Sequence, residues 1–334
     1  MNHKLPFALL MLILLAACGA NPATTATALP ATPITLPATA TALPVTVAAL
    51  DETPTMGAIT LTDDLGHAVT LAGPAQHIVS MAPSNTELLF AVGAGSQVVG
   101  RDTLSDYPPQ ARSLADIGGS MGTFDTEAIV ALHPDLVLAA EINPPDLVAS
   151  LQKLGLTVYY LKNPVTLDGL YANLETVGAL TGYAAAAATF VASLKARVAA
   201  VDAKVATATT RPSVYYELDG TDPTKPYTSG GGTFVDQLIH QAGGVNIFTQ
   251  LNTAWPQVSL EQLLVDNPQI ILLGDSAYGE TPDKVSGRPG WGSLLAVKNK
   301  QVYPFDDNLV SRPGPRLVDG LEALAKLIHP ELFK

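Results

Sequence analysis

The 334-residue chain is predicted to be an α/β protein with two similar lobes of mostly parallel sheet, joined by one long helix. Three observations predict this fold. A short sequence pattern occurs twice, short apolar segments alternate with helical stretches in both halves, and an Ala-rich segment lies between the halves. Such alternation of strands and helices is typical of a parallel sheet covered by helices.

The repeated pattern begins with a glutamate in the first turn of a short predicted helix, Glu127 in one copy and Glu261 in the other. Seven residues later a proline, Pro134 or Pro268, stops the helix, and a short apolar strand follows. The helix macrodipole keeps a carboxylate at this position ionised. A symmetric pair of exposed carboxylates suits a two-fold cationic partner better than it suits catalysis.

Residues 1–18 are predicted to be a lipoprotein signal peptide. The apolar run over residues 5–17 is too short to span a bilayer but has the length of a signal-peptide core. Cys18, the one cysteine of the chain, follows small residues as in a bacterial lipobox, so we expect it to be lipidated. The alternative is a plain secretory signal. Without a second cysteine there is no disulfide framework.

Residues 19–56 consist mainly of Ala, Thr, Pro and Leu and predict a disordered, semi-extended tether. After it, no apolar run approaches the 18 residues of a membrane-spanning helix. The net charge of −12, with only 18 Lys and Arg, argues against nucleic acid as a partner.

The N-terminal lobe is predicted to cover residues 57–181. Ser84, with Glu87 three residues later, matches a capping box and predicts a helix ending near Gly93. The other expected elements are a hairpin of residues 59–62 and 69–71, and strands at 78–81, 97–99, 136–138 and 158–161.

The C-terminal lobe, residues 209–334, is predicted to repeat this scheme, and residues 182–208 are predicted to form the helix between the lobes. Its apolar residues recur at spacings of three and four, which indicates an amphipathic helix; the alternative is a surface helix of one large domain. The lobe's expected elements are strands at 214–216, 270–273 and 302–304 and helices at 233–242 and 316–328.

Enzyme and metal signatures are mostly missing. The chain has no dinucleotide-binding fingerprint, no phosphate-binding loop and no Gly-x-Ser-x-Gly elbow. Its six histidines are scattered, and each is expected in a loop or at the surface rather than in a metal site. A hydrolase with carboxylates brought together across a cleft stays open, although no pair is singled out.

Aromatic and cationic residues instead gather in predicted loops at strand ends: Trp255, Tyr227 and Arg312. In open α/β sheets the carboxyl ends of the strands form the ligand crevice. Aromatic faces beside an arginine suit a large, flat, partly anionic ligand. A core position is the alternative for Trp255, and the Gly/Pro surroundings of Trp291 suit a loop cap equally well.

Five segments of the chain match one known family of proteins: 78–88, 105–111, 127–136, 255–262 and 315–317. By these segments the chain, from about Gly57 to its C-terminus, resembles the class III solute-binding proteins of ATP-binding-cassette (ABC) importers, the group that handles cobalamin, haem and iron-siderophores.

The resemblance implies two α/β lobes on a single spine helix with little hinge motion. It also implies a non-catalytic, monomeric, extracytoplasmic protein that delivers its ligand to a permease dimer. By the same resemblance, Glu127 and Glu261 fall on the family's two carboxylates that dock onto permease arginines.

The resemblance also implies a ligand. Trp255 matches an aromatic residue that packs on the corrin ring and Tyr227 falls near a second, while Asp307 with Arg312 falls near a polar pair. Leu104 and Met121 replace two aromatic residues of the cobalamin binders.

We therefore expect cobalamin or a related corrinoid, with a ferric siderophore as the alternative. Haem is less favoured, because no loop Tyr or His stands out as an axial ligand. The protein itself needs no cofactor, whereas the ligand carries cobalt or iron. An extracytoplasmic enzyme or sensor on the same fold is the alternative from another class.

Overall fold

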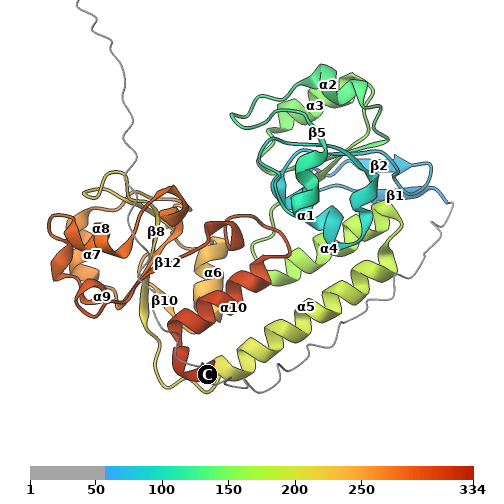
Figure 1. Ribbon diagram of the computed structural model, residues 1–334. Coiled ribbons are helices and arrows are strands. Elements are labelled where there is room, and N and C mark those ends of the chain that lie inside the picture. The colour runs from blue at the N-terminus through green and yellow to red at the C-terminus, as the bar shows by residue number, and fades with distance from the viewer. Residues whose placement is uncertain (1–56) are drawn as a thin grey trace, which may run out of the picture. The chain divides into compact units, whose positions relative to one another are not determined.

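The computed structural model describes residues 57–334 (Figure 1). The predicted signal peptide, Cys18 and the predicted tether lie outside the described residues. The described part begins with the predicted hairpin, in which β1 (Ile59–Thr62) pairs antiparallel with β2 (Ala68–Leu71).

The N-terminal lobe is a five-stranded parallel sheet of order β5-β4-β3-β6-β7. Its central strands β3 and β6 are buried throughout, as expected where helices cover both faces of a parallel sheet. The strands are β3 (Ile78–Ser80), β4 (Val98–Arg101), β5 (Ala115–Asp116), β6 (Leu136–Ala140) and β7 (Val158–Leu161), and the helices are α1 (Pro83–Ala91), α2 (Thr126–Ala131), α3 (Pro145–Lys153) and α4 (Leu167–Thr181).

The C-terminal lobe repeats the parallel arrangement in the order β10-β8-β11-β12, and β9 adds to β8 in the antiparallel sense. The strands are β8 (Ser213–Asp219), β9 (Tyr227–Thr228), β10 (Val245–Asn246), β11 (Ile270–Leu273) and β12 (Val302–Pro304), and the helices are α6 (Phe234–Gln241), α7 (Leu260–Asp266), α8 (Pro282–Gly287), α9 (Leu295–Lys298) and α10 (Leu317–Ile328).

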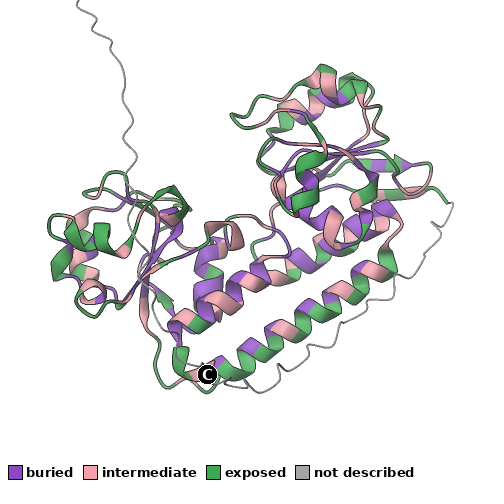
Figure 2. Ribbon diagram, viewed as in Figure 1, coloured by how far each residue is buried: buried purple, intermediate pink, exposed green. Residues whose placement is uncertain are grey.

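Along one side of both lobes runs α5 (Ala184–Val205), which packs against α4 and α10 (Figure 1). Although this 22-residue helix is long and apolar enough to cross a membrane, its apolar stripe is packed into the core, whereas its opposite face is exposed (Figure 2). One apolar cluster contains residues of both lobes together with this stripe, so α5 is a spine rather than a peripheral surface helix. The stripe is Val191, Leu194, Val198, Val201 and Val205.

The predicted capping box at Ser84 is wrong. Helix α1 begins at Pro83, Ala82 is its N-cap, and no side chain caps its first turn. Proline suits this first helical position because its missing N–H would have no intrahelical partner there. Glu87 therefore does not fold back on the backbone, and its carboxylate is buried elsewhere.

The repeated pattern forms the same structure in both lobes. Glu127 and Glu261 are each the second residue of their helix, α2 and α7. A side chain caps each helix, since the Asp125 carboxylate accepts from the Ala128 N–H at 2.9 Å. In α7 the Ser259 hydroxyl accepts from the backbone N–H of Gln262 at 3.1 Å.

Both helices also end alike. His133 and Asn267 adopt left-handed φ angles of 48° and 41°, directly before Pro134 and Pro268. Asparagine tolerates this conformation better than most residues, and the following proline prevents continuation of the helix. In each lobe the next parallel strand, β6 or β11, begins two residues after the proline.

Candidate ligand-binding site

An exposed aromatic surface lies on the C-terminal lobe, where residues 227–230 run beside residues 254–257. The Thr228 N–H donates to the Pro256 carbonyl at 3.0 Å, and the Gly230 N–H donates to the Ala254 carbonyl at 2.9 Å. This pairing brings Tyr227 and Trp255 onto neighbouring segments. Tyr227 is 40% exposed and Trp255 is 41% exposed. Trp255 is therefore not a core anchor.

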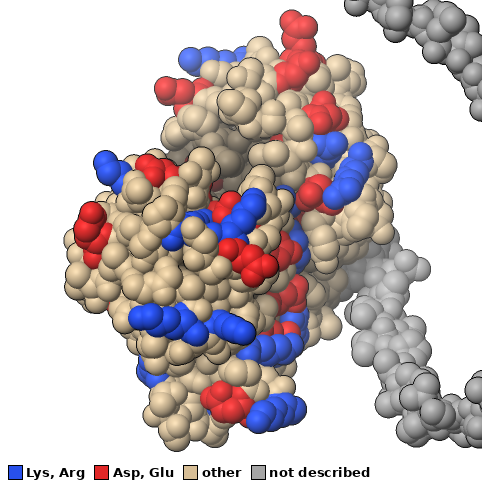
Figure 3. All heavy atoms as spheres, turned by 60° about the vertical axis from the view of Figure 1, so that its left-hand side comes forward, with Lys and Arg blue, Asp and Glu red and all other residues tan. Residues whose placement is uncertain are grey.

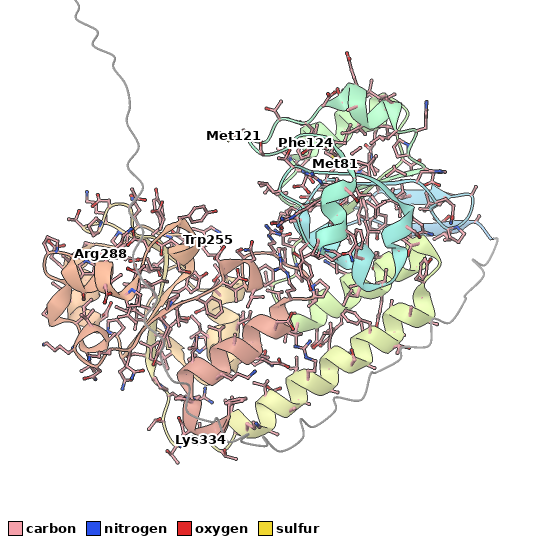
Figure 4. The ribbon with its side chains drawn as sticks, viewed as in Figure 1. Met81, Met121, Phe124, Trp255, Arg288 and Lys334 are labelled. Atoms are coloured by element: carbon pink, nitrogen blue, oxygen red, sulfur yellow. The ribbon has the colours of Figure 1, made fainter. Side chains whose placement is uncertain are left out.

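An aliphatic surface lies on the N-terminal lobe. The Thr103 N–H donates to the Gly118 carbonyl at 2.8 Å, which holds the loop after β4 against the loop that precedes α2. Leu104 is 47% exposed and Met121 90% exposed on these two loops. Figure 4 places Met121 and Trp255 on facing edges of the two lobes, and the space-filling view shows a hollow between the lobes (Figure 3).

Arg312, expected to contact ligand, is joined to the opposite lobe. Its Nη1 lies 2.6 Å from Asp106 Oδ1 and 3.7 Å from Glu87 Oε1. Partial burial alone would raise the pKa of Asp106, but the hydrogen bond and charge of Arg312 outweigh burial, so this pKa is lowered. The carboxylate therefore stays ionised, and Asp106 and Arg312 form an ion pair across the lobes.

Asp307 does not pair with Arg312 in the described structure. Its carboxylate accepts a hydrogen bond from the hydroxyl of Tyr216. Because Tyr216 is completely buried, its hydroxyl needs a protein partner. In the structure each of the two residues expected near the ligand, Asp307 and Arg312, contacts a protein side chain.

A second link between the lobes joins Glu87 of α1 to Arg316, the residue before α10. Two hydrogen bonds run from the guanidinium to the carboxylate, 2.6 Å from Nη2 to Oε1 and 2.9 Å from Nε to Oε2. Burial alone would lower the pKa of Arg316, but the hydrogen bonds and charge of Glu87 raise it. The Tyr107 ring covers the guanidinium, with its centroid 4.2 Å from Cζ.

Sequence reasoning missed Glu87, Asp106, Tyr107 and Arg316 as a group. Each lies in a segment that supports the family resemblance, but nothing local indicates that the four side chains meet. Their sequence separations, up to 229 residues between Glu87 and Arg316, make the cluster a consequence of tertiary structure.

Glu127 and Glu261 are both exposed on helices that lie in their lobes away from the spine helix α5 (Figure 1). The pKa of Glu261 is lowered, first by its own backbone N–H and next by the hydroxyl of Ser259. Both carboxylates are therefore accessible from solvent.

The structure also shows where Trp291 and His329 lie. Trp291 is completely buried, and its indole N–H donates to the Pro223 carbonyl at 3.0 Å, so it is a core residue. His329 is buried and lies in the loop that follows α10, so it meets the expectation of a loop position but not of a surface position. Within residues 57–334, no group of three or more His, Cys, Asp or Glu side chains is arranged to hold a metal ion.

The sequence matches a family model described as "Periplasmic binding protein" over residues 78–309. A relative in Bacillus subtilis (strain 168), "Uncharacterized ABC transporter substrate-binding lipoprotein YvrC", is 32% identical over 281 residues, covering 83% of this chain and 87% of the relative. A "Vitamin B12-binding protein" of Vibrio cholerae is 35% identical over 259 residues, covering 75% of this chain and 87% of the relative.

Solved structures agree with this result. The crystal structure of the periplasmic vitamin B12-binding protein BtuF of Vibrio cholerae aligns with a TM-score of 0.66 and 30% identity, covering 78% of this chain and 99% of that chain. The periplasmic heme-binding protein RhuT from Roseiflexus sp. RS-1, in its apo form, aligns with a TM-score of 0.69 and 27% identity, covering 77% of this chain and 99% of that chain.

The family match, the two parallel sheets on one spine helix and these similarities lead to one conclusion. The chain belongs to the periplasmic binding protein family, as an extracytoplasmic solute-binding protein of the class III group that serves ABC importers.

Proposed function

We propose that this protein captures cobalamin or a related corrinoid between its two lobes and delivers it to an ABC importer. The observation that carries the proposal is the pair of exposed surfaces, Tyr227 with Trp255 on one lobe and Leu104 with Met121 on the other. A large ring system would bury both surfaces at once, and its flat face matches the aromatic side chains. The similarity to vitamin B12-binding proteins supports the same ligand.

The aliphatic surface of the N-terminal lobe also suits a ferric siderophore, which is the alternative to a corrinoid as the ligand. Leu104 and Met121 offer no flat ring, so the N-terminal lobe can pack against a globular iron complex as well as against a corrin. Iron- and haem-related proteins also share the fold. An enzyme or sensor on this fold is less favoured, because the family consists of solute-binding proteins.

A fluorescence titration tests the ligand. Cobalamin should quench tryptophan emission with a Kd below about 1 μM, which corresponds to roughly −8 kcal/mol. Trp255→Ala removes one of the two tryptophans, so calorimetry measures its affinity beside that of the wild type, and binding should be weaker by about 1–3 kcal/mol. Leu154→Ala, which changes an exposed apolar residue at the end of α3, is the control and should leave the affinity unchanged.

If wild-type protein ignores cobalamin but binds a ferric siderophore tightly, the corrinoid proposal is wrong and the siderophore alternative takes its place.

For delivery, we propose that Glu127 and Glu261 contact arginines on the two subunits of the permease dimer. Both carboxylates occupy equivalent helix positions, and a two-fold partner presents the same surface twice. Contacts between arginine and carboxylate are geometrically specific as well as attractive. The solute-binding protein acts as a monomer in this scheme.

For anchoring, we propose that Cys18 carries a lipid that holds the protein at the outer face of the membrane. The similarity to a lipoprotein supports this assignment. Cys18→Ser should release the protein from the membrane fraction without a change in ligand affinity. Retention of the variant in salt-washed membranes would contradict it.

A further inference from the structure

Four arginines lie near the carboxyl ends of the strands, and each is already held by a carboxylate. The shortest ion-pair distances are 2.9 Å for Arg101 with Asp116 and 2.6 Å for Arg288 with Glu217. The other two arginines, Arg312 and Arg316, make the interlobe pairs, each with a shortest distance of 2.6 Å. An anionic ligand would therefore find no free guanidinium among these four side chains.

Asp106 is the most accessible carboxylate of the two interlobe pairs. Its side chain is 45% exposed, against 1% for Glu87. Asp106 also lies two residues from Leu104 on the exposed loop after β4, so a ligand against Leu104 lies close to the Asp106–Arg312 pair. Arg112 approaches Asp106 at 3.4 Å, but its side chain is 68% exposed, so that contact is weak.

The loop that precedes Arg312 carries further negative charge. Asp306 and Asp307 lie in the loop that precedes Arg312, and positive and negative side chains are interspersed on the face shown in Figure 3. Lys225, near Tyr227, is an exposed cation of the aromatic side and makes no ion pair within 4 Å in residues 57–334.

We infer that Asp106 is a specificity-determining residue: by neutralising Arg312, it selects a ligand without net negative charge. This inference rests on the proposed function and narrows its ligand class to an uncharged corrinoid or an uncharged iron complex. A carboxylate or catecholate that binds Arg312 either replaces Asp106 or shares the guanidinium with it, since Asp106 uses only Nη1. In both cases the positive charge is already balanced, so the anion gains little. Asp106 would then remain beside the anion, and that repulsion disfavours the charged ligand.

Two ferric complexes test this inference, a ferric trihydroxamate siderophore, which is uncharged, and a ferric tricatecholate siderophore, which is triply negative. Cyanocobalamin is titrated in parallel. Wild-type protein should prefer the trihydroxamate. Asp106→Asn should raise the affinity for the tricatecholate by about tenfold, equivalent to about 1.4 kcal/mol. Its affinities for the trihydroxamate and cyanocobalamin should stay within about threefold.

Two further variants identify the cause. Asp146→Asn on α3 makes the same change in net charge on an exposed helix and should leave all three affinities unchanged. In the double variant Asp106→Asn/Arg312→Gln the gain for the tricatecholate should largely disappear, because the Arg312 guanidinium is gone and the exposed Arg112 interacts only weakly. A thermal unfolding curve for each variant verifies that it is folded.

Equal wild-type affinities for the two ferric complexes, or an affinity ratio that Asp106→Asn leaves unchanged, would overturn the inference. Failure of cyanocobalamin to bind is a separate result, since it rejects the corrinoid proposal while the two ferric complexes still decide the role of Asp106.

Discussion

Glu87 lies in the core of the molecule at 3% exposure, yet its cationic partners among residues 57–334, Arg312 and Arg316, belong to the other lobe. A buried carboxylate is costly unless it is paired and hydrogen-bonded, and Arg316 meets both requirements. The Tyr107 ring shields the same guanidinium. The two lobes are thus joined by a charged contact in addition to the continuous chain.

Removal of this carboxylate should destabilise the fold. Glu87→Ala leaves Arg316 buried without its partner, and the free energy of unfolding should fall by about 3–5 kcal/mol in a urea titration. The double variant Glu87→Leu/Arg316→Leu should recover much of that loss, because neither charge remains buried. A loss below about 1 kcal/mol in Glu87→Ala would show that the contact does not hold the lobes together.

Individual residues show how unevenly a sequence predicts a site. The position of Trp255 in a Pro-containing loop before α7 was sufficient to predict exposure near a strand end, and the structure agrees. Glu87 was assigned to a capping box because Ser84 precedes it by three residues, a local pattern that chance also produces. The role of Arg312 as a ligand contact stays a prediction, and no local signal in the sequence reveals that Asp106 holds it.

At the scale of elements, the repeated pattern was predictable because its signals are local. Helix start, proline stop and apolar strand appear in order within about fifteen residues in each lobe. The spine helix was equally predictable, since its apolar stripe follows helical periodicity. The pairing of residues 227–230 with 254–257 was not, because close approach of two backbone segments depends on tertiary packing.

Gly230 is required at this close approach. A Cβ built there would lie 2.0 Å from the Thr253 carbonyl oxygen, so Gly230→Ala must push apart the two segments that carry Tyr227 and Trp255. We expect the free energy of unfolding to fall by about 1–3 kcal/mol. Ligand affinity should fall as well, because the aromatic surface is displaced.

Gly287→Ala is the matched control, since nothing lies within 4 Å of its Cβ position. This variant should retain both stability and affinity. Unchanged ligand binding by a folded Gly230→Ala variant would show that the 227–230 segment does not position the aromatic surface.

At the scale of the whole molecule, the two-lobed architecture was predictable in full outline, whereas the ligand was not. Sheets and helices follow from periodic patterns, but ligand choice depends on a few side chains contributed by distant loops. Among these, Leu104 and Met121 are aliphatic and thus compatible with several ring systems or iron complexes.

Transport should require both lobes. Glu127→Gln and Glu261→Gln should each reduce uptake and permease binding, and the double variant should be more impaired than either single variant. Neither side chain is placed on the apolar surfaces that face the hollow, so ligand affinity of the isolated protein should stay within about threefold. Loss of ligand binding in each single variant would assign these residues to the cleft and reject the docking proposal.

The length of α5, 22 residues, affects how the two lobes can move relative to each other. At about 1.5 Å per residue the helix is roughly 33 Å long, and it connects two lobes that each hold one glutamate on a short helix before a central strand. Each carboxylate therefore moves with its own sheet. A rotation of one lobe relative to the other changes the separation of Glu127 and Glu261. The distance between these two carboxylates therefore reports the angle between the lobes.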